Sequence, residues 1–213
     1  MAPRCADTVS APSPGTAGDC SIASRVVSNP FDEIPVLPVV IPFGVVIFAV
    51  LLWRLRATGR FSGPRAAVAA ALAVYASGIL ANTVFPIYRN PPAQLEPWTP
   101  GVVLVPFADY EVGDAVMNIL VFLPIGVLIP LLLARPNLWR VLTAAAGTSL
   151  AIELTQLSVQ GPLGGGHIAD VSDFICNTVG GVLGYALFAL VSRWPWCSRI
   201  IDRFRWAEAE SSA

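Results

Sequence analysis

Apolar residues gather in five long segments of this 213-residue chain, and short polar stretches separate them. An α-helix needs about 20 apolar residues to cross a bilayer, and each segment reaches that length. The segments are Ile34–Leu55, Arg65–Ile87, Asp114–Ala134, Leu138–Val159 and Ser172–Ser192. The pattern predicts an all-α, polytopic integral membrane protein with about five transmembrane helices. It places a helical membrane domain at residues 34–193, between tails at residues 1–33 and 194–213.

Prolines break this pattern in two places. Three of them near the start of the first segment predict an irregular or kinked entry, and Pro124 interrupts the third segment. Between the second and third segments, RNPPAQLEPWTPG is too rich in proline to be a helix. The following VVLVPFADYEVGD is too short to span a bilayer. We therefore expect a re-entrant or interfacial piece before the third helix.

The composition supports a membrane protein and excludes other classes. Charged residues make up only 13% of the chain, whereas a soluble domain carries about 25%. The net charge of −1 excludes a nucleic-acid-binding protein that works through a broad basic surface. The four cysteines form no CxxC pair, so a cysteine metal site is not expected. The N-terminal tail lacks the apolar region of a signal peptide, and its Ala, Pro, Ser and Gly content predicts disorder.

The arginines indicate an orientation, because cytoplasmic loops carry an excess of basic residues. One side of a five-helix arrangement would hold Arg54, Arg56, Arg60, Arg65, Arg135, Arg140, Arg193, Arg199, Arg203 and Arg205. The other side would hold Arg4, Arg25 and Arg89. We therefore predict a multi-pass protein of the bacterial plasma membrane, with its N terminus outside and its C terminus in the cytoplasm. The tail RWPWCSRIIDRFRW mixes Trp with Arg and predicts an interfacial helix on the lipids of the inner leaflet.

Polar residues gather near the outer ends of four predicted helices. Spacings of three or four residues put the polar residues of one helix on one face. The fourth helix carries Ser149, Glu153, Gln156 and Gln160, and the fifth carries Asp170, Asp173 and Asn177. The third contributes Asp114 and Asn118, and the second contributes Asn82. We expect these faces to form one polar cavity that opens to the outside.

Structural roles compete with functional ones for some of these residues. Asn82 and Ser149 have the residue types that hydrogen-bond neighbouring membrane helices to one another. Asp173 has the residue type that caps a helix N terminus. Glu153 favours function, because a carboxylate inside a membrane costs roughly 3 kcal/mol and is usually functional or paired. His167, the sole histidine, lies in a glycine-rich loop close to the acidic residues.

Three stretches in this order resemble the VanZ-like membrane protein family. They are MNILVFLPIGVLI from Met117, SLAIELTQL from Ser149 and HIADVSDFICNTVGGVLG from His167. The upstream LVPFADY resembles a short element of the same family, so the resemblance covers roughly Val102–Leu190. His167 stands where the family normally has Arg, and Ser172 where it often has a second acid. The resemblance implies a small all-helical membrane domain, and a named member is associated with resistance to the glycopeptide teicoplanin.

Two hypotheses for the function stay open from the sequence. In the first, a binding module engages a lipid-linked envelope precursor or a glycopeptide through an extracytoplasmic polar pocket. Its candidate ligand-binding residues are Asn118, Glu153, Gln156, His167, Asp170, Asp173 and Asn177. In the second, a membrane-embedded enzyme modifies a lipid-linked substrate by carboxylate acid/base or metal-assisted chemistry. A transporter is disfavoured by the short chain without a repeat. We predict no cofactor, and we interpret His167 as a counter-ion to the aspartates rather than as a metal ligand.

Overall fold

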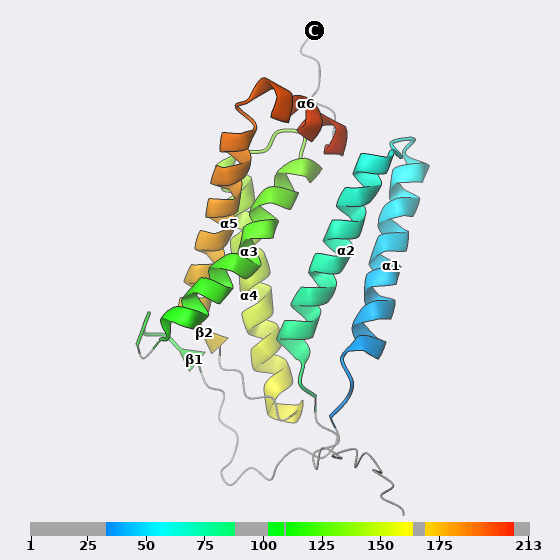
Figure 1. Ribbon diagram of the computed structural model, residues 1–213. Helices are drawn as coiled ribbons and strands as arrows, with labels where there is room; N and C mark the ends of the chain where they lie inside the picture. Colours follow the sequence, from blue (N-terminus) through cyan, green and yellow to red (C-terminus); the bar gives the residue numbers. More distant parts are fainter. Residues whose placement is uncertain (1–32, 88–101, 109, 164–168, 207–213) are drawn as a thin grey trace, which may run out of the picture.

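The computed structural model describes residues 33–87, 102–108, 110–163 and 169–206. Its described part is built from helices, together with one two-residue ladder (Figure 1). The helices are α1 (Leu37–Ala57), α2 (Gly63–Val84), α3 (Val112–Leu132), α4 (Leu138–Leu163), α5 (Val171–Val191) and α6 (Pro195–Phe204). The strands are β1 (Val102–Val103) and β2 (Ala169–Asp170). The all-helical class predicted from the apolar pattern is therefore confirmed.

Four helices, α1, α2, α3 and α5, are long and apolar enough to cross a membrane, so the chain is a multi-pass membrane protein. The fourth predicted span also forms a helix, α4, but it is more polar than these four. Its buried polar residues, Ser149, Glu153 and Gln156, lie on the face that the sequence assigned to the cavity. The predicted helix boundaries hold to within a few residues. Phe85 is extended and ends α2 because the residue before a proline, here Pro86, avoids helical backbone angles.

The expected break at Pro124 is not found, because α3 continues through both Pro124 and Pro130. Membrane helices tolerate proline where neighbouring groups satisfy the freed backbone carbonyls. The re-entrant or interfacial character expected of the piece before α3 stays a prediction. Its described part begins with strand β1, which pairs in parallel with β2 through Val102–Ala169 and Val103–Asp170.

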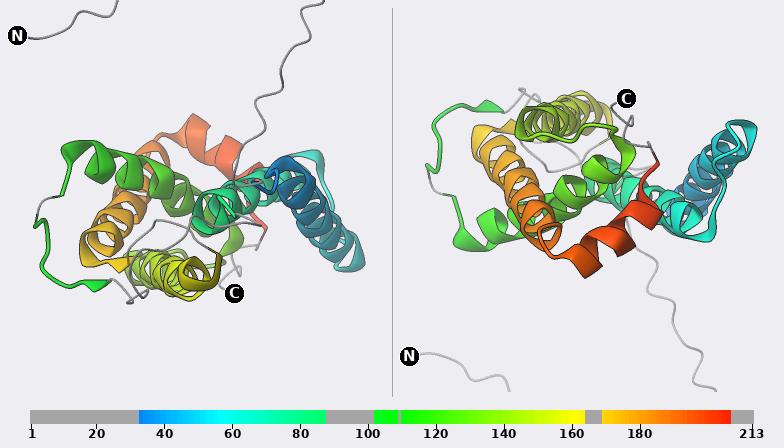
Figure 2. Two further views of the ribbon diagram at one scale, coloured as in Figure 1. Left: turned by 90° about the horizontal axis from the view of Figure 1, so that it is seen from below. Right: turned by 90° about the horizontal axis from the view of Figure 1, so that it is seen from above.

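The closest helix packing joins α3 to α5 through glycines. A methyl group at Gly180 would collide with the backbone of Ile119, and one at Gly184 would collide with the backbone of Leu123. Small residues let membrane helices approach until their backbones touch. α4 packs beside this pair, whereas α1 stands at the edge of the bundle and packs on α2 (Figure 2). These glycines therefore serve helix packing.

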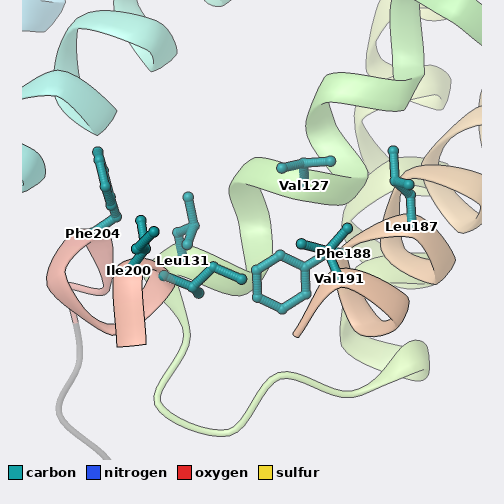
Figure 3. A pocket seen from close by; sticks show the side chains of 8 residues that line it. Val127, Leu131, Leu187, Phe188, Val191, Ile200 and Phe204 are labelled. Atoms are coloured by element: carbon teal, nitrogen blue, oxygen red, sulfur yellow. The ribbon is translucent and has the colours of Figure 1, made fainter. Parts of the chain in front are cut away.

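The helix α6 closes the end of the bundle that carries the arginine-rich loops (Figure 1). Trp206 fastens it there, because its backbone N–H donates to the Leu131 carbonyl at 2.8 Å and its Nε1–H donates to the Arg65 carbonyl at 3.2 Å. Side chains of α3, α5 and α6, among them Leu131, Phe188 and Phe204, surround an apolar pocket of about 340 Å³ (Figure 3). The predicted helix in the tail is present, and its Ile201 and Phe204 pack against the bundle, whereas Trp196 is exposed.

Candidate functional site

Polar side chains from four helices line one small space. They belong to the second halves of α2 and α4 and the first halves of α3 and α5, which lie at the end of the bundle opposite α6 (Figure 1). The volume of the space is about 30 Å³. We call this space the polar cavity, and its polar lining consists of Asn82, Thr83, Asn118, Glu153, Gln156, Asp173 and Asn177. The sequence predicted a shared cavity, and the structure brings five of the seven candidate residues to it. The other two are Asp170, which lies elsewhere, and His167, which lies outside the described residues.

Asp173 is held by a network that ties α5 to α3. Asn118 Nδ2 donates to Asp173 Oδ1 at 2.6 Å and to the Tyr110 hydroxyl oxygen at 2.9 Å. The Tyr110 hydroxyl in turn donates to Asp173 Oδ1. Burial, followed by the adjacent Asp173 carboxylate, raises the pKa of the Tyr110 hydroxyl well above its ordinary value. Tyr110 therefore stays protonated and acts as a donor at any physiological pH.

Tyr110 was not among the candidate residues, although it ends the LVPFADY element quoted for the family resemblance. Its position depends on Ser172, whose side chain is fully buried and whose Oγ accepts the Phe107 N–H at 3.0 Å. The Phe107 ring then packs edge-on against the Tyr110 ring, with the centroids 5.9 Å apart. Ser172, which stands where the family often has an acid, thus anchors the segment that delivers Tyr110.

Glu153 connects α4 to the start of α5. Its Oε2 accepts the backbone N–H of Asp170 at 3.1 Å, and the side chain is buried. The Asp170 carboxylate in turn accepts the Ser172 N–H at 2.7 Å and caps α5. Capping is therefore the role of Asp170, not of Asp173. A carboxylate at a helix N terminus satisfies a free N–H group and complements the helix dipole.

Ser149 and Asn177 form the interhelical contact expected of such residues. Asn177 Nδ2 donates to Ser149 Oγ at 3.0 Å, and both side chains are buried. The other end of the Asn177 amide remains unsatisfied. Within the described residues, Asn177 Oδ1 and Gln156 Oε1 are buried and accept no hydrogen bond. Leaving a buried acceptor unpaired costs about 1–3 kcal/mol, so two of them on one cavity wall require an explanation.

An apolar groove of about 330 Å³ runs beside the polar cavity, between α4, α5 and the ladder. Its walls are mainly aliphatic, from Val102, Leu104, Leu150, Leu154, Leu157, Ala169 and Val171, and Phe174 adds an aromatic ring. Glu153 and Asp170 also line it. Glu153 therefore lines both the polar cavity and the apolar groove. Asp170 faces the groove, which corrects its expected place on the polar face of the fifth helix.

No three His, Cys, Asp or Glu side chains within the described ranges are grouped so that they could hold a metal ion. The interpretation of His167 as a counter-ion stays a prediction, because that residue lies outside these ranges. The polar lining of the cavity consists of two carboxylates, four side-chain amides and one hydroxyl, and its two buried atoms without a partner are both hydrogen-bond acceptors.

A model of the VanZ/LLP1 family matches residues 72–192, which is more than half of the chain. The chain belongs to the VanZ/LLP1 family. The match begins about 30 residues before the motifs that suggested it, so the family domain includes most of α2. It therefore contains every helix that lines the polar cavity, and the groove as well. No curated protein and no solved structure matches the chain.

Proposed function

We propose that this VanZ/LLP1 protein is a binding module for an amphiphilic ligand of the bacterial cell envelope. The observation that carries the proposal is the position of Glu153, which lines a polar cavity on one side and an apolar groove on the other. A lipid-linked ligand has the matching character, since its chain would occupy the groove and a polar group of its head would reach the cavity. Lipid-linked envelope precursors and lipid-bearing glycopeptides such as teicoplanin have this build.

The location of the site supports an encounter outside the cytoplasm. Arginines lie in the last turn of α1, in the turn after α3 and in α6, at the end of the bundle away from the helix halves that line the polar cavity (Figure 1). By the excess of basic residues in cytoplasmic loops, that arginine-rich end faces the cytoplasm and the cavity faces outward. The proposed topology has five spans, namely the four apolar helices and α4. Its N terminus lies outside the cell and its C terminus lies in the cytoplasm. Binding an envelope ligand there would alter susceptibility to teicoplanin-type glycopeptides.

The test is binding by the full chain in phosphatidylcholine nanodiscs. A fluorescent lipid-linked peptidoglycan precursor and teicoplanin are the two probes, and at least one is expected to bind saturably. Leu154→Trp fills the groove, and excluding two methylene groups of a bound chain costs about 1.6 kcal/mol, or roughly fifteenfold in affinity. Leu183→Trp is the matched control, because Leu183 is 48% exposed, Leu154 is 54% exposed, and Leu183 lies on α5 outside the groove.

Equal binding by both variants would refute the groove as the chain site. In cells, Leu154→Trp is expected to cancel any change in teicoplanin susceptibility that the wild type confers, whereas Leu183→Trp retains it. Mass spectrometry of the recovered precursor distinguishes binding from catalysis. A protein-dependent change in mass would replace the binding module with the envelope-modifying enzyme.

A further inference from the structure

Two buried amide oxygens define what the polar cavity lacks. Gln156 is 7% exposed and Asn177 is 4% exposed, and within the described residues neither Gln156 Oε1 nor Asn177 Oδ1 accepts a hydrogen bond. Both side chains line the cavity. Asn177 Nδ2 donates to Ser149 Oγ, and Asn177 Oδ1 is left without a donor. The missing groups are therefore hydrogen-bond donors.

The size of the cavity limits the donor to a small group. Its volume is about 30 Å³, and one water-sized group needs about 10–15 Å³ by this measure. A sugar ring does not fit, whereas the tip of a side chain or of a lipid head does. The ligand therefore inserts a terminal group, and the bulk of its head stays outside the cavity.

The charge of the cavity selects among small donors. Its charged lining within the described residues consists of Glu153 and Asp173, which are both carboxylates. The Asp173 carboxylate already receives hydrogen bonds from Tyr110 and Asn118. The Glu153 carboxylate receives one hydrogen bond, from the Asp170 backbone N–H. This donor is neutral, so it does not balance the negative charge of Glu153. A buried carboxylate is stabilised most by a cation that also donates hydrogen bonds.

We infer that the polar cavity binds the protonated primary amine of the amphiphilic ligand, held by Gln156 Oε1, Asn177 Oδ1 and the Glu153 carboxylate. An ammonium group has three N–H donors and no acceptor, which matches these three acceptors one for one. A hydroxyl would supply one donor and no charge. This inference rests on the proposed function and specifies the head group of its ligand. The amine could belong to an ethanolamine lipid or to the free amine of a lipid-linked peptide.

The test uses three single-chain probes with the full chain in phosphatidylcholine nanodiscs. Dodecylamine, dodecyltrimethylammonium and dodecanol share the same chain but differ in charge and in N–H donors. Dodecylamine is expected to bind at least about tenfold tighter than either of the others, because each charge-assisted hydrogen bond contributes about that much. Equal binding of the trimethylammonium probe would overturn the inference, since that group carries the charge without a donor.

Gln156→Met removes one acceptor with little change in side-chain length. It is expected to weaken dodecylamine about tenfold and to leave dodecanol unchanged. It also removes an unpaired buried polar group, so the variant should fold at least as stably as the wild type. Ser158→Ala is the matched control on the same helix, since Ser158 is exposed and its hydroxyl bonds to the Leu154 carbonyl. Unchanged dodecylamine affinity in Gln156→Met would overturn the inference.

Competition identifies the source of the amine. Phosphatidylethanolamine and a lipid-linked peptide with a free amine are each tested as competitors of dodecylamine, beside the N-acetylated form of the peptide. Displacement by either amine supports the inference and names its source, and displacement by neither overturns it. Sodium chloride and choline chloride test for a metal cation in the polar cavity. If sodium chloride alone raises the melting temperature, and does so in the wild type but not in Gln156→Met, the cavity binds a metal cation and the inference is overturned. Saturable precursor binding with no preference for amines would refute the inference while the proposed function stands.

Discussion

The Tyr110 hydroxyl is the point at which the segment before α3 reaches the polar cavity, so its removal tests how the site is assembled. Tyr110→Phe keeps the ring and its edge-on packing against Phe107. It removes the hydroxyl that donates to Asp173 and accepts from Asn118 at 2.9 Å. Asn118 donates to the same Asp173 oxygen at 2.6 Å and is left in place, so we expect the carboxylate to keep one of its two side-chain donors.

The expected loss follows from these two bonds. A hydrogen bond to a charged group contributes about 1.5–3 kcal/mol, and water replaces part of it here because Tyr110 is only partly buried. We expect the free energy of unfolding to fall by about 1.5–2 kcal/mol. For a chain of this size that lowers the melting temperature by about 3–8 °C. Tyr185→Phe is the control, since the Tyr185 hydroxyl makes no hydrogen bond among the described residues, and it should change the melting temperature little.

The pH dependence gives an independent readout of the same hydroxyl. Its pKa is raised in the folded protein by burial and by Asp173, whereas an unfolded tyrosine loses its proton near pH 10. The folded state therefore holds the proton more tightly, so the contribution to stability is complete below about pH 10 and is lost as the pH rises further. Denaturation of detergent-solubilised protein at pH 8 and pH 11 measures this loss. If the wild type loses no more stability between pH 8 and pH 11 than Tyr110→Phe does, the network is refuted. Equal melting temperatures for Tyr110→Phe and Tyr185→Phe would also refute it.

The remaining predictions concern helix packing and topology. Gly180→Ala places a methyl group against the Ile119 backbone and should cost at least about 1–3 kcal/mol in thermal stability. Gly147 has open space around it, so Gly147→Ala should be neutral or stabilising by up to about 1 kcal/mol. A larger loss of stability in Gly147→Ala than in Gly180→Ala would contradict the close α3–α5 contact. In a cysteine-free background, Glu111→Cys should react with a membrane-impermeant thiol reagent on intact cells, whereas Asn137→Cys should not, and labelling of the latter alone would invert the topology.

The helices were predictable because one local property defines them. A backbone that crosses lipid must satisfy its own hydrogen bonds, so long apolar runs become helices almost wherever they occur. The interpretation of Pro124 as a break was wrong for a reason that the sequence does not contain. Whether a proline ends a membrane helix depends on the neighbouring groups. Here α3 is packed against α5 along the stretch that contains Pro124.

The convergence of Asn118, Gln156 and Asn177 was also predictable, because helical spacing fixes which residues share a face. The ladder was not predictable, since Val102 and Ala169 are far apart in sequence and each strand has only two residues. The roles of Asp170 and Tyr110 depend on that ladder and on the loop beside it. The sequence therefore misplaced Asp170 and missed Tyr110, although each belongs to a stretch that resembles the family.

The position of Glu153 explains why a polar helix belongs in this membrane protein. A carboxylate here is costly unless it is paired, and its one described partner is the Asp170 backbone N–H, which belongs to the ladder. The ladder thus holds Glu153 at the border of the groove before any ligand arrives. An incoming amine would then meet an oriented acceptor and two unpaired amide oxygens, and the cost of ordering them has already been met during folding. The polarity that leaves α4 out of the apolar candidate spans is what would make it a binding surface under the proposed function.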